Sequence, residues 1–338
     1  MTVEQRETGA HDQTRGGEQK RPRASVVIVN WNTRELILQC LDSLKESLGD
    51  FPAEIIVVDN DSADGSPEAV EERHPDVRLI RSGANLGFAR GNNLGFRHAR
   101  GDYFVLLNSD TIVLPGAVQR LVEFLDEHPE FAAAGGQHLD VERRYAPAAH
   151  PFPSLRHDLS VATGIDSLGR RLLRRNSPLA RFWFPLDTQE VDWVSNSFVA
   201  VRREVVERVG GLPEEFFLYG DDVEWYWRVR RAGMRVAYVH GAPIIHLENQ
   251  SSNQLYQSEK PFRNLDGLYT FAYRRRNPVG WRIGWLAFAA YWGALGIKWS
   301  LKARRTGDER DAEMARWLRS YARYHVEQVL GRVEPIAR

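Results

Sequence analysis

The chain has 338 residues, of which 43% are hydrophobic and 27% are charged, the composition of an ordinary folded protein rather than a disordered or collagen-like one. Its 45 basic and 45 acidic side chains cancel, which argues against generic nucleic-acid binding through net positive charge. The length suffices for one large domain, or for a domain of about 250 residues with an appendage.

The first 23 residues are polar and contain no apolar run. They cannot form a secretory signal, and we expect them to be a disordered leader. Cys40 is the one cysteine of the chain, so no intramolecular disulfide can form. Both features fit a protein of a reducing compartment, and we expect it to be cytoplasmic.

Short β-branched runs alternate with helical stretches in the first third of the chain. The runs are SVVIV (25–29), EIIVV (54–58), VRLI (77–80) and YFVLL (103–107). Such alternation predicts a parallel sheet covered by helices. After the first run, Asn32 is expected to cap a helix with Glu35 reaching back, and its apolar stripe comprises Leu36, Cys40, Leu41 and Leu44. Pro67 after Ser66 predicts the start of a second helix.

The middle of the chain, residues 141–190, is rich in prolines and loops, with a basic amphipathic stretch at 169–175. We expect structure on the acceptor side of a site there. Beyond it, the pattern predicts a helix over 202–211 that glycines end, and a second helix over 221–233 with Asp221 as its cap. A strand is expected at 235–239.

After about residue 255 the sequence looks helical to its end. Between residues 260 and 305 there are ten Lys or Arg and one acid, which indicates an anionic partner. Residues 283–297 carry no charge but fall short of the roughly twenty residues that span a bilayer. One interpretation is a helix in the membrane interface, with its tryptophans at the headgroups: Trp281, Trp285, Trp292 and Trp299. A helix packed on the catalytic domain or on a second subunit is equally open.

Polar residues follow the apolar runs at the strand ends, where ligands bind in open α/β sheets. The first run is followed by Asn30, Trp31 and Asn32, and the second by Asp59. An aspartate there can accept the imide N–H of uracil or thymine. Asp110 follows the fourth run and suits a hard divalent cation that bridges two phosphates. Ordinary turn chemistry explains each loop when it is taken alone.

Taken together, the segments resemble family 2 of the glycosyltransferases, in particular its rhamnosyltransferase-like branch. The resemblance covers about residues 24–252 and rests on SVVIVNWN, IIVVDNDSADGS, NLGFARGNNLG, NSD, VDWVSNSF, GGLPEEFFLYGDD and the His246 segment. The joint match is highly specific although each piece is not. It implies a GT-A fold of the α/β class over residues 24–255, with a mostly parallel central sheet flanked by helices. A C-terminal helical region, 256–338, would follow.

The resemblance also implies roles for single residues. Asp222 would be the general base, with Asp221 beside it on the acceptor side. Asp110 and His246 would hold a divalent metal, Mg²⁺ or Mn²⁺, although Asn108 replaces the first acid of the family's metal motif. Asn196 stands where the family has glycine. The nucleotide-sugar site would be formed by Val29, Asn30, Trp31, Asp59, Asn85, Gly87, Asn93, Asp110, Trp193 and Ser195.

The expected reaction is sugar transfer with inversion at the anomeric carbon. Asp222, at a helix N-terminus, should stay ionised and take the proton of the acceptor hydroxyl, while the metal stabilises the leaving diphosphate. We expect a dTDP- or UDP-linked donor, with rhamnose as the first candidate sugar. The acceptor would be a glycan or polyprenyl-linked molecule at the inner face of the plasma membrane, in cell-surface polysaccharide or glycolipid synthesis. Alternatives are a nucleotidyltransferase and a non-catalytic nucleotide-sugar-binding protein of the same fold.

Overall fold

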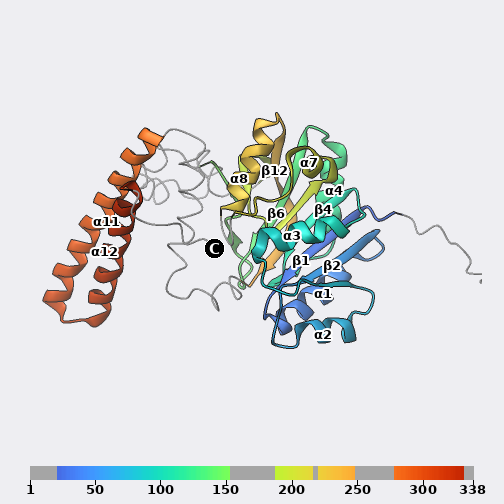
Figure 1. Ribbon diagram of the computed structural model, residues 1–338, viewed down its shortest axis with the longest axis horizontal. Coiled ribbons are helices and arrows are strands. Elements are labelled where there is room, and N and C mark those ends of the chain that lie inside the picture. The colour runs from blue at the N-terminus through green and yellow to red at the C-terminus, as the bar shows by residue number, and fades with distance from the viewer. Residues whose placement is uncertain (1–20, 153–186, 216–219, 248–277, 331–338) are drawn as a thin grey trace, which may run out of the picture.

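The computed structural model describes residues 21–152, 187–215, 220–247 and 278–330. The predicted basic stretch at 169–175 and nearly all of the predicted leader lie outside these ranges. The predicted division into a leader, a catalytic domain and a helical region stays a prediction. In the described part, an α/β unit is followed by two long C-terminal helices (Figure 1).

The four predicted N-terminal strands all form and lie parallel to one another. They are β1 (Ala24–Asn30), β2 (Ala53–Asp59), β3 (Arg78–Arg81) and β4 (Tyr103–Asn108). Nearly every residue of β1, β2 and β4 is buried on both faces, as β-branched runs without alternation predict.

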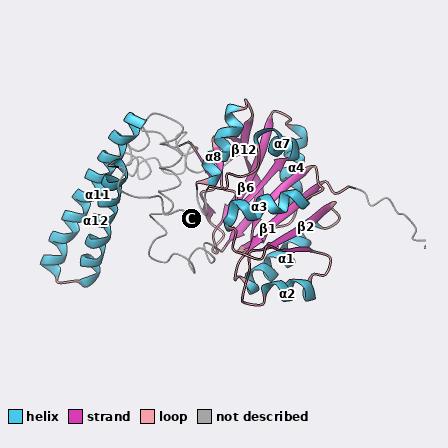
Figure 2. Ribbon diagram, viewed as in Figure 1, coloured by secondary structure: helices cyan, strands magenta, loops and turns pink. Residues whose placement is uncertain are grey.

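The sheet continues beyond β4 with strands that follow β4 in the chain (Figure 2). Its order is β3-β2-β1-β4-β11-β6-β12-β5. The added strands are β5 (Thr111–Val113), β6 (Phe131–Leu139), β11 (Phe198–Arg202) and β12 (Arg235–His246). Strand β11 runs antiparallel to both β4 and β6, and β12 runs parallel to β6. Strands β6 and β12 therefore point the same way as β1, β2 and β4.

Short strands complete the described part of this region. Strand β7 (Tyr145–Ala146) pairs with β6, and β9 (Gln189–Val191) pairs with β12. Strands β8 (Ala149–His150) and β10 (Trp193–Val194) form a separate antiparallel pair. Strands β7 and β8 and the first two residues of β9 lie within the region where we expected acceptor-side structure, and β10 lies just beyond it.

Helices cover both faces of the sheet. One hydrophobic cluster joins it to α1 (Arg34–Leu48), α2 (Ser66–Arg73) and α4 (Ala117–Glu127). The cluster on the other face involves α3 (Gly87–His98), α7 (Arg203–Val209) and α8 (Asp221–Arg231). Adjacent strand residues such as Val26 and Val27 belong to different clusters, because successive side chains of a strand point to opposite faces.

Glycines let α3 pack closely on β1. A Cβ at Gly95 would lie 2.3 Å from Cγ1 of Val27, and one at Gly91 would lie 2.9 Å from Cγ1 of Val29. Both distances are shorter than carbon atoms tolerate. The repeated glycines of GFARGNNLG therefore serve the packing of a helix on a strand.

Local predictions at two helix starts were wrong. Helix α1 begins one residue later than a cap at Asn32 requires, with Thr33 at the cap, and Asn32 instead has φ 51° and accepts a hydrogen bond from Ala63 N. In α8 the cap is Gly220, so Asp221 is the first helical residue. The stripe of α1 is also rotated from the predicted one, since Ile37 is fully buried and Leu36 only partly.

The C-terminal helices α11 (Pro278–Thr306) and α12 (Glu309–Val329) form an antiparallel hairpin (Figure 1). Among the described residues, neither they nor any other helix is apolar enough over a sufficient length to cross a membrane. Two of the predicted headgroup tryptophans point elsewhere. Trp285 is 3% exposed, and Trp292 packs edge-on against Tyr321 of α12. Trp285 is therefore buried, and Trp292 faces α12, which covers that side of α11.

Candidate functional site

Several of the predicted site residues gather at one edge of the sheet. Asn30, Asp59 and Asn108 end the parallel strands β1, β2 and β4, and His246 ends β12. Since β11 runs the opposite way, its first residues and the preceding loop, 195–197, reach the same edge. The strand order thus brings together residues that are far apart in the chain, at the carboxyl edge where α/β sheets bind ligands.

The first group of contacts involves the ends of β1 and β2. Asn30 donates from Nδ2 to Oδ1 of Asp59 over 3.0 Å, and Asp59 accepts a second hydrogen bond from Ser62 N. Thr33 donates to Oδ1 of Asn30 over 2.6 Å and lies 3.1 Å from Oγ of Ser109. These contacts fix Asp59 and connect it to the residue that precedes Asp110.

Val29 and Trp31 flank Asn30, both partly buried. Neighbouring Asn60 is buried and donates to Gly87 O over 3.1 Å, while its Oδ1 has no hydrogen-bond partner within the described residues. A buried acceptor of this kind is costly unless a ligand or water satisfies it. Asn60 is therefore a candidate ligand contact that the sequence interpretation missed, although it follows Asp59 directly.

The NLGFARGNN segment lies beside this group. Asn85 accepts a hydrogen bond from Gly87 N over 3.0 Å, and Gly87 has φ 76°, a conformation that glycine adopts without strain. Asn93 is buried, and its amide exchanges hydrogen bonds with the backbone of Leu212 and donates to Glu214. Asn93 therefore connects α3 to the 212–214 segment through hydrogen bonds. Its role in lining a donor site stays a prediction.

The two predicted metal ligands form a pair. Nε2 of His246 lies 3.2 Å from Oδ1 of Asp110, with the side chains 17% and 7% exposed. Asn108 Nδ2 is 3.5 Å from the same imidazole nitrogen, and Leu247 N donates to Asp110 O. No cluster of three or more His, Cys, Asp or Glu that could hold a metal occurs in the described ranges. A carboxylate and an imidazole nevertheless fit a cation that takes only one or two protein ligands and the rest from phosphates.

His138 is a second histidine at this site, and the sequence analysis did not identify it. It is 3% exposed, and its ring meets that of His246 edge to face at 5.6 Å between centroids. Its Nε2 lies 3.4 Å from Oγ of Ser197. Burial, with the nearby His246 and His150, lowers the pKa of His138 to about 3. The ring is therefore neutral at physiological pH. Its place near the end of a small-residue strand, FAAAGGQHL, was the available signal.

The 193–197 segment borders the same edge. Trp193 stacks on His150 at 4.4 Å between centroids and donates from Nε1 to Pro151 O. Ser195 Oγ lies 2.8 Å from Ser197 Oγ. A chain of side-chain contacts thus runs from Ser195 through Ser197 and His138 to His246.

Asn196, which departs from the family pattern, is 4% exposed and bridges two side chains. Its Oδ1 accepts a hydrogen bond from Tyr226 OH over 3.0 Å, and its Nδ2 lies 3.5 Å from Oδ2 of Asp221. An asparagine at this position therefore ties the loop to helix α8. A glycine could not make either contact.

The acidic pair lies in the first turn of α8. Asp221 is buried, whereas Asp222 is partly exposed and accepts a hydrogen bond from Val223 N. Burial raises the pKa of Asp221 to about 8, with a further contribution from the charge of Asp222. Burial also raises the pKa of Asp222 to about 6. The expected effect of the helix dipole is thus outweighed, yet Asp222 remains mostly ionised at pH 7.

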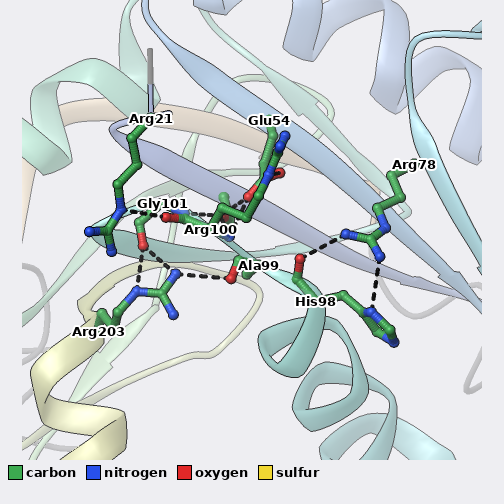
Figure 3. A network of polar contacts seen from close by, with 9 residues as sticks. Arg21, Glu54, Arg78, His98, Ala99, Arg100, Gly101 and Arg203 are labelled. Atoms are coloured by element: carbon green, nitrogen blue, oxygen red, sulfur yellow. Dashed lines mark hydrogen bonds and ion pairs between the residues drawn. The ribbon is translucent and has the colours of Figure 1, made fainter. Parts of the chain in front are cut away.

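A separate open pocket of about 600 Å³ lies at the opposite edge of the sheet, at the amino ends of β1, β2 and β4. Its arginines have protein partners (Figure 3). Arg203 donates to Gly101 O and Ala99 O, Arg100 pairs with Glu54, and Arg21 donates to Arg100 O. This network fixes the loop before β4, and the pocket contains none of the predicted site residues.

The carboxyl edge contributes two chemical parts, a hydrogen-bonded aspartate that could accept an imide N–H and a carboxylate–imidazole pair that could hold a cation. A third part, a carboxylate whose pKa lies near physiological pH, is Asp222 in the first turn of α8, which Asn196 ties to the loop at this edge. The last of these suits proton abstraction, which is most efficient when the pKa is close to the working pH.

Comparison with known proteins gives a consistent result. The family described as "Glycosyl transferase family 2" matches residues 25–210. An N-acetylglucosaminyl-diphospho-decaprenol L-rhamnosyltransferase of Mycobacterium tuberculosis is 29% identical over 222 residues, covering 60% of this chain and 69% of that protein. A low-salt glycan biosynthesis hexosyltransferase of Haloferax volcanii is 23% identical over 251 residues, covering 71% of this chain and 73% of that protein.

Among solved structures, a mannosyltransferase from Pyrobaculum calidifontis, in complex with GDP-Man and Mn²⁺, has a similar fold. The TM-score is 0.52 with 19% sequence identity, and the match covers 92% of this chain and 87% of that one. At this identity the likeness concerns the fold, and it confirms the predicted GT-A architecture.

Proposed function

Because the chain belongs to glycosyl transferase family 2 and is therefore an enzyme that transfers a sugar from a nucleotide donor, we propose that it does so with inversion at the anomeric carbon. Asp222 is the proposed base. Its pKa is raised to about 6, which leaves it mostly ionised at pH 7, and it is partly exposed in the first turn of α8. One carboxylate that takes the acceptor proton during in-line attack needs no covalent intermediate, and a single displacement inverts the configuration.

Asp221 has a different part in this proposal. With a pKa of about 8 it carries its proton at pH 7, so it does not compete with Asp222 for the acceptor's proton. Two ionised carboxylates side by side would repel each other, and the environment separates their pKa values. Asn196 and Tyr226 then position Asp221 against the loop that precedes β11.

The donor nucleotide would lie across the ends of β1, β2 and β4. Asp59 would accept the imide N–H of a uracil or thymine, and beside it Asn60 Oδ1 is an acceptor with no partner among the residues that the structure describes. Val29, Trp31 and the 85–87 turn would line the base and ribose. Trp193 and Ser195 would lie near the transferred sugar.

Asp110 and His246 would hold a divalent cation, either Mg²⁺ or Mn²⁺. When bound, such an ion would neutralise charge on the departing diphosphate. The fit rests on the donor chemistry of the pair and on their 3.2 Å approach at the carboxyl edge. His138 packs its ring against His246 and would limit how far that imidazole can turn.

For the sugar and the acceptor, the printed name of the mycobacterial relative is the guide. That protein is an L-rhamnosyltransferase that acts on N-acetylglucosaminyl-diphospho-decaprenol. By analogy we propose a dTDP- or UDP-linked hexose, with rhamnose as the first candidate, and a polyprenyl-linked or other glycan acceptor. The setting would be cell-surface polysaccharide or glycolipid synthesis at the cytoplasmic face of the plasma membrane.

Membership in a family of sugar transferases argues against the two alternatives, a nucleotidyltransferase and a non-catalytic nucleotide-sugar-binding protein. The observation that carries the proposal is the pairing of Asp110 with His246 on the same edge as Asp59. A thermal-shift screen of nucleoside diphosphates with and without Mn²⁺ identifies the donor, because a ligand that binds only the folded chain stabilises it. NMR of the product made with that donor then gives the anomeric configuration. Retention of the donor's configuration, or stabilisation by no nucleotide, would contradict the proposal.

A further inference from the structure

Helix α11 carries a continuous apolar stripe on its exposed side. Its members follow one another at intervals of three or four residues, which places them on one face of a helix. They are Ile283, Leu286, Ala290, Ala294, Ile297 and Leu301, all exposed. The large side chains are about half exposed or more: Ile283 57%, Leu286 48%, Ile297 60% and Leu301 51%. At 1.5 Å per residue the stripe runs for about 27 Å.

The stripe is distinct from the core of the hairpin. A different face of α11 packs on α12: Phe288 stacks on His325, Trp292 meets Tyr321 edge to face, and a Cβ at Gly296 would lie 2.9 Å from Cγ of Arg319. The apolar residues of the stripe therefore do not serve the pairing of the two helices. Exposed apolar surface of this extent marks an interaction site.

Charge at the edges of the stripe has one sign. Helix α11 contains no acidic residue, and Lys298, Arg304 and Arg305 are exposed with no ion-pair partner among the residues that the structure describes. Helix α12 differs, since Arg316 pairs with Glu309 and Arg323 with Glu327. The partner of α11 must therefore be both apolar and anionic.

We propose that this face of α11 binds an anionic lipid surface, with the stripe entering the acyl boundary and the cations at the phosphates. Such a surface complements both features at once. A second copy of the chain does not, because a symmetric contact through α11 would bring cations against cations with no acid on that helix to pair with them. The proposal goes beyond sugar transfer and does not depend on it.

The test is flotation of the full chain with vesicles of phosphatidylcholine, alone or mixed with phosphatidylglycerol. We expect binding to the mixed vesicles and much weaker binding to the neutral ones. The variant Ile283→Ser, Leu286→Ser, Ile297→Ser, Leu301→Ser should lose at least about tenfold in affinity, because each of these side chains contributes apolar area. The variant Lys298→Gln, Arg304→Gln, Arg305→Gln should also bind less and lose its dependence on salt.

The matched control removes the same charge from α12 through Arg310→Gln, Arg316→Gln and Arg323→Gln, and it should float more like the wild type than the α11 charge variant does. Circular dichroism verifies that each variant keeps its helices. The proposal fails if the wild type does not float with mixed vesicles, or if the stripe variant floats equally well. A wild type that sediments as a dimer and a stripe variant that is monomeric, without lipid binding in either, would assign the face to a second copy instead. Transfer to a soluble acceptor, measured in parallel, reports on the proposed function separately.

Discussion

Nε2 of His246 lies 3.2 Å from Oδ1 of Asp110, although 136 residues separate them along the chain. The contact arises because β4 and β12 both end at the carboxyl edge of the sheet and β5, which follows Asp110, pairs with the last residues of β12. The two proposed metal ligands are thus held together by the backbone hydrogen bonds between β5 and β12.

The pair leads to a prediction about metal binding. Replacing His246 with Ala should weaken Mn²⁺ binding in the presence of the nucleoside diphosphate by at least about tenfold, because one of two protein ligands is lost. Isothermal titration calorimetry measures the affinity. His240→Ala is the matched control, since His240 is exposed on the same strand and should leave the affinity unchanged. Equal affinities in the two variants would remove His246 from the metal site.

Asp222→Asn should lower turnover by about 10²–10⁴-fold, the usual contribution of a general base. Donor binding should remain nearly intact, because Asn keeps the size of the side chain and no donor contact is assigned to Asp222. Product formation and calorimetric titration of the donor measure the two effects. Asp76→Asn serves as the control. Asp76 forms an ion pair with Lys45 of α1 and lies in the loop before β3, at the other end of the strand order from β12. Substantial turnover by Asp222→Asn would transfer the role of base to another group.

The pH dependence of activity follows from the carboxyl groups of Asp221 and Asp222. Activity should fall as the pH drops through about 6, where Asp222 takes up a proton, and fall again above about 8, where Asp221 loses its own. In Asp221→Asn the upper limb should disappear while the lower limb stays. A profile of kcat/KM against pH for both proteins gives the answer, and an upper limb that persists in the variant would exclude Asp221 as its source.

The raised pKa of Asp221 should also make the free energy of unfolding depend on pH. The pKa of Asp221 is raised from 3.8 to about 8 on folding, so the folded chain binds more protons than the unfolded one within this window. Its free energy of unfolding therefore decreases as the pH rises from about 4 to about 8. Asp221→Asn should remove this contribution and raise Tm at pH 8 relative to pH 5 by at least about 2 °C. Thermal melts of the wild type and the variant at pH 5 and pH 8 test this prediction. If the change in Tm between the two pH values is the same in both proteins, the prediction is wrong.

Gly95→Ala tests the packing of α3 on β1. The new Cβ would lie 2.3 Å from Cγ1 of Val27, and overpacking of about 1–3 kcal/mol exceeds the gain of up to about 1 kcal/mol in helix propensity. Denaturant unfolding should show a lower free energy of unfolding. Arg97→Ala, on the exposed side of the same helix, is the control and should change it little. A stabilised Gly95→Ala variant would mean that helix and strand can move apart at low cost.

The sequence by itself determined the strand ends and the residues beyond them. Continuous β-branched runs that alternate with helical stretches predict strands buried on both faces that lie parallel under helices, which places Asp59 and Asp110 at one edge. The motif set added His246 and Asp222. These conclusions required only local patterns and their order in the chain.

Tertiary structure decided which distant side chains meet. The contact of His138 with His246 depends on β6 lying beside β12, and the bridge from Tyr226 through Asn196 to Asp221 depends on α8 lying over the start of β11. In α11, all four tryptophans looked equivalent in sequence, and only the tertiary structure shows that Trp285 is buried and that Trp292 faces α12. A local sequence pattern indicates that one face of a helix or strand is apolar. Which other element covers that face depends on packing between segments that are distant in the chain.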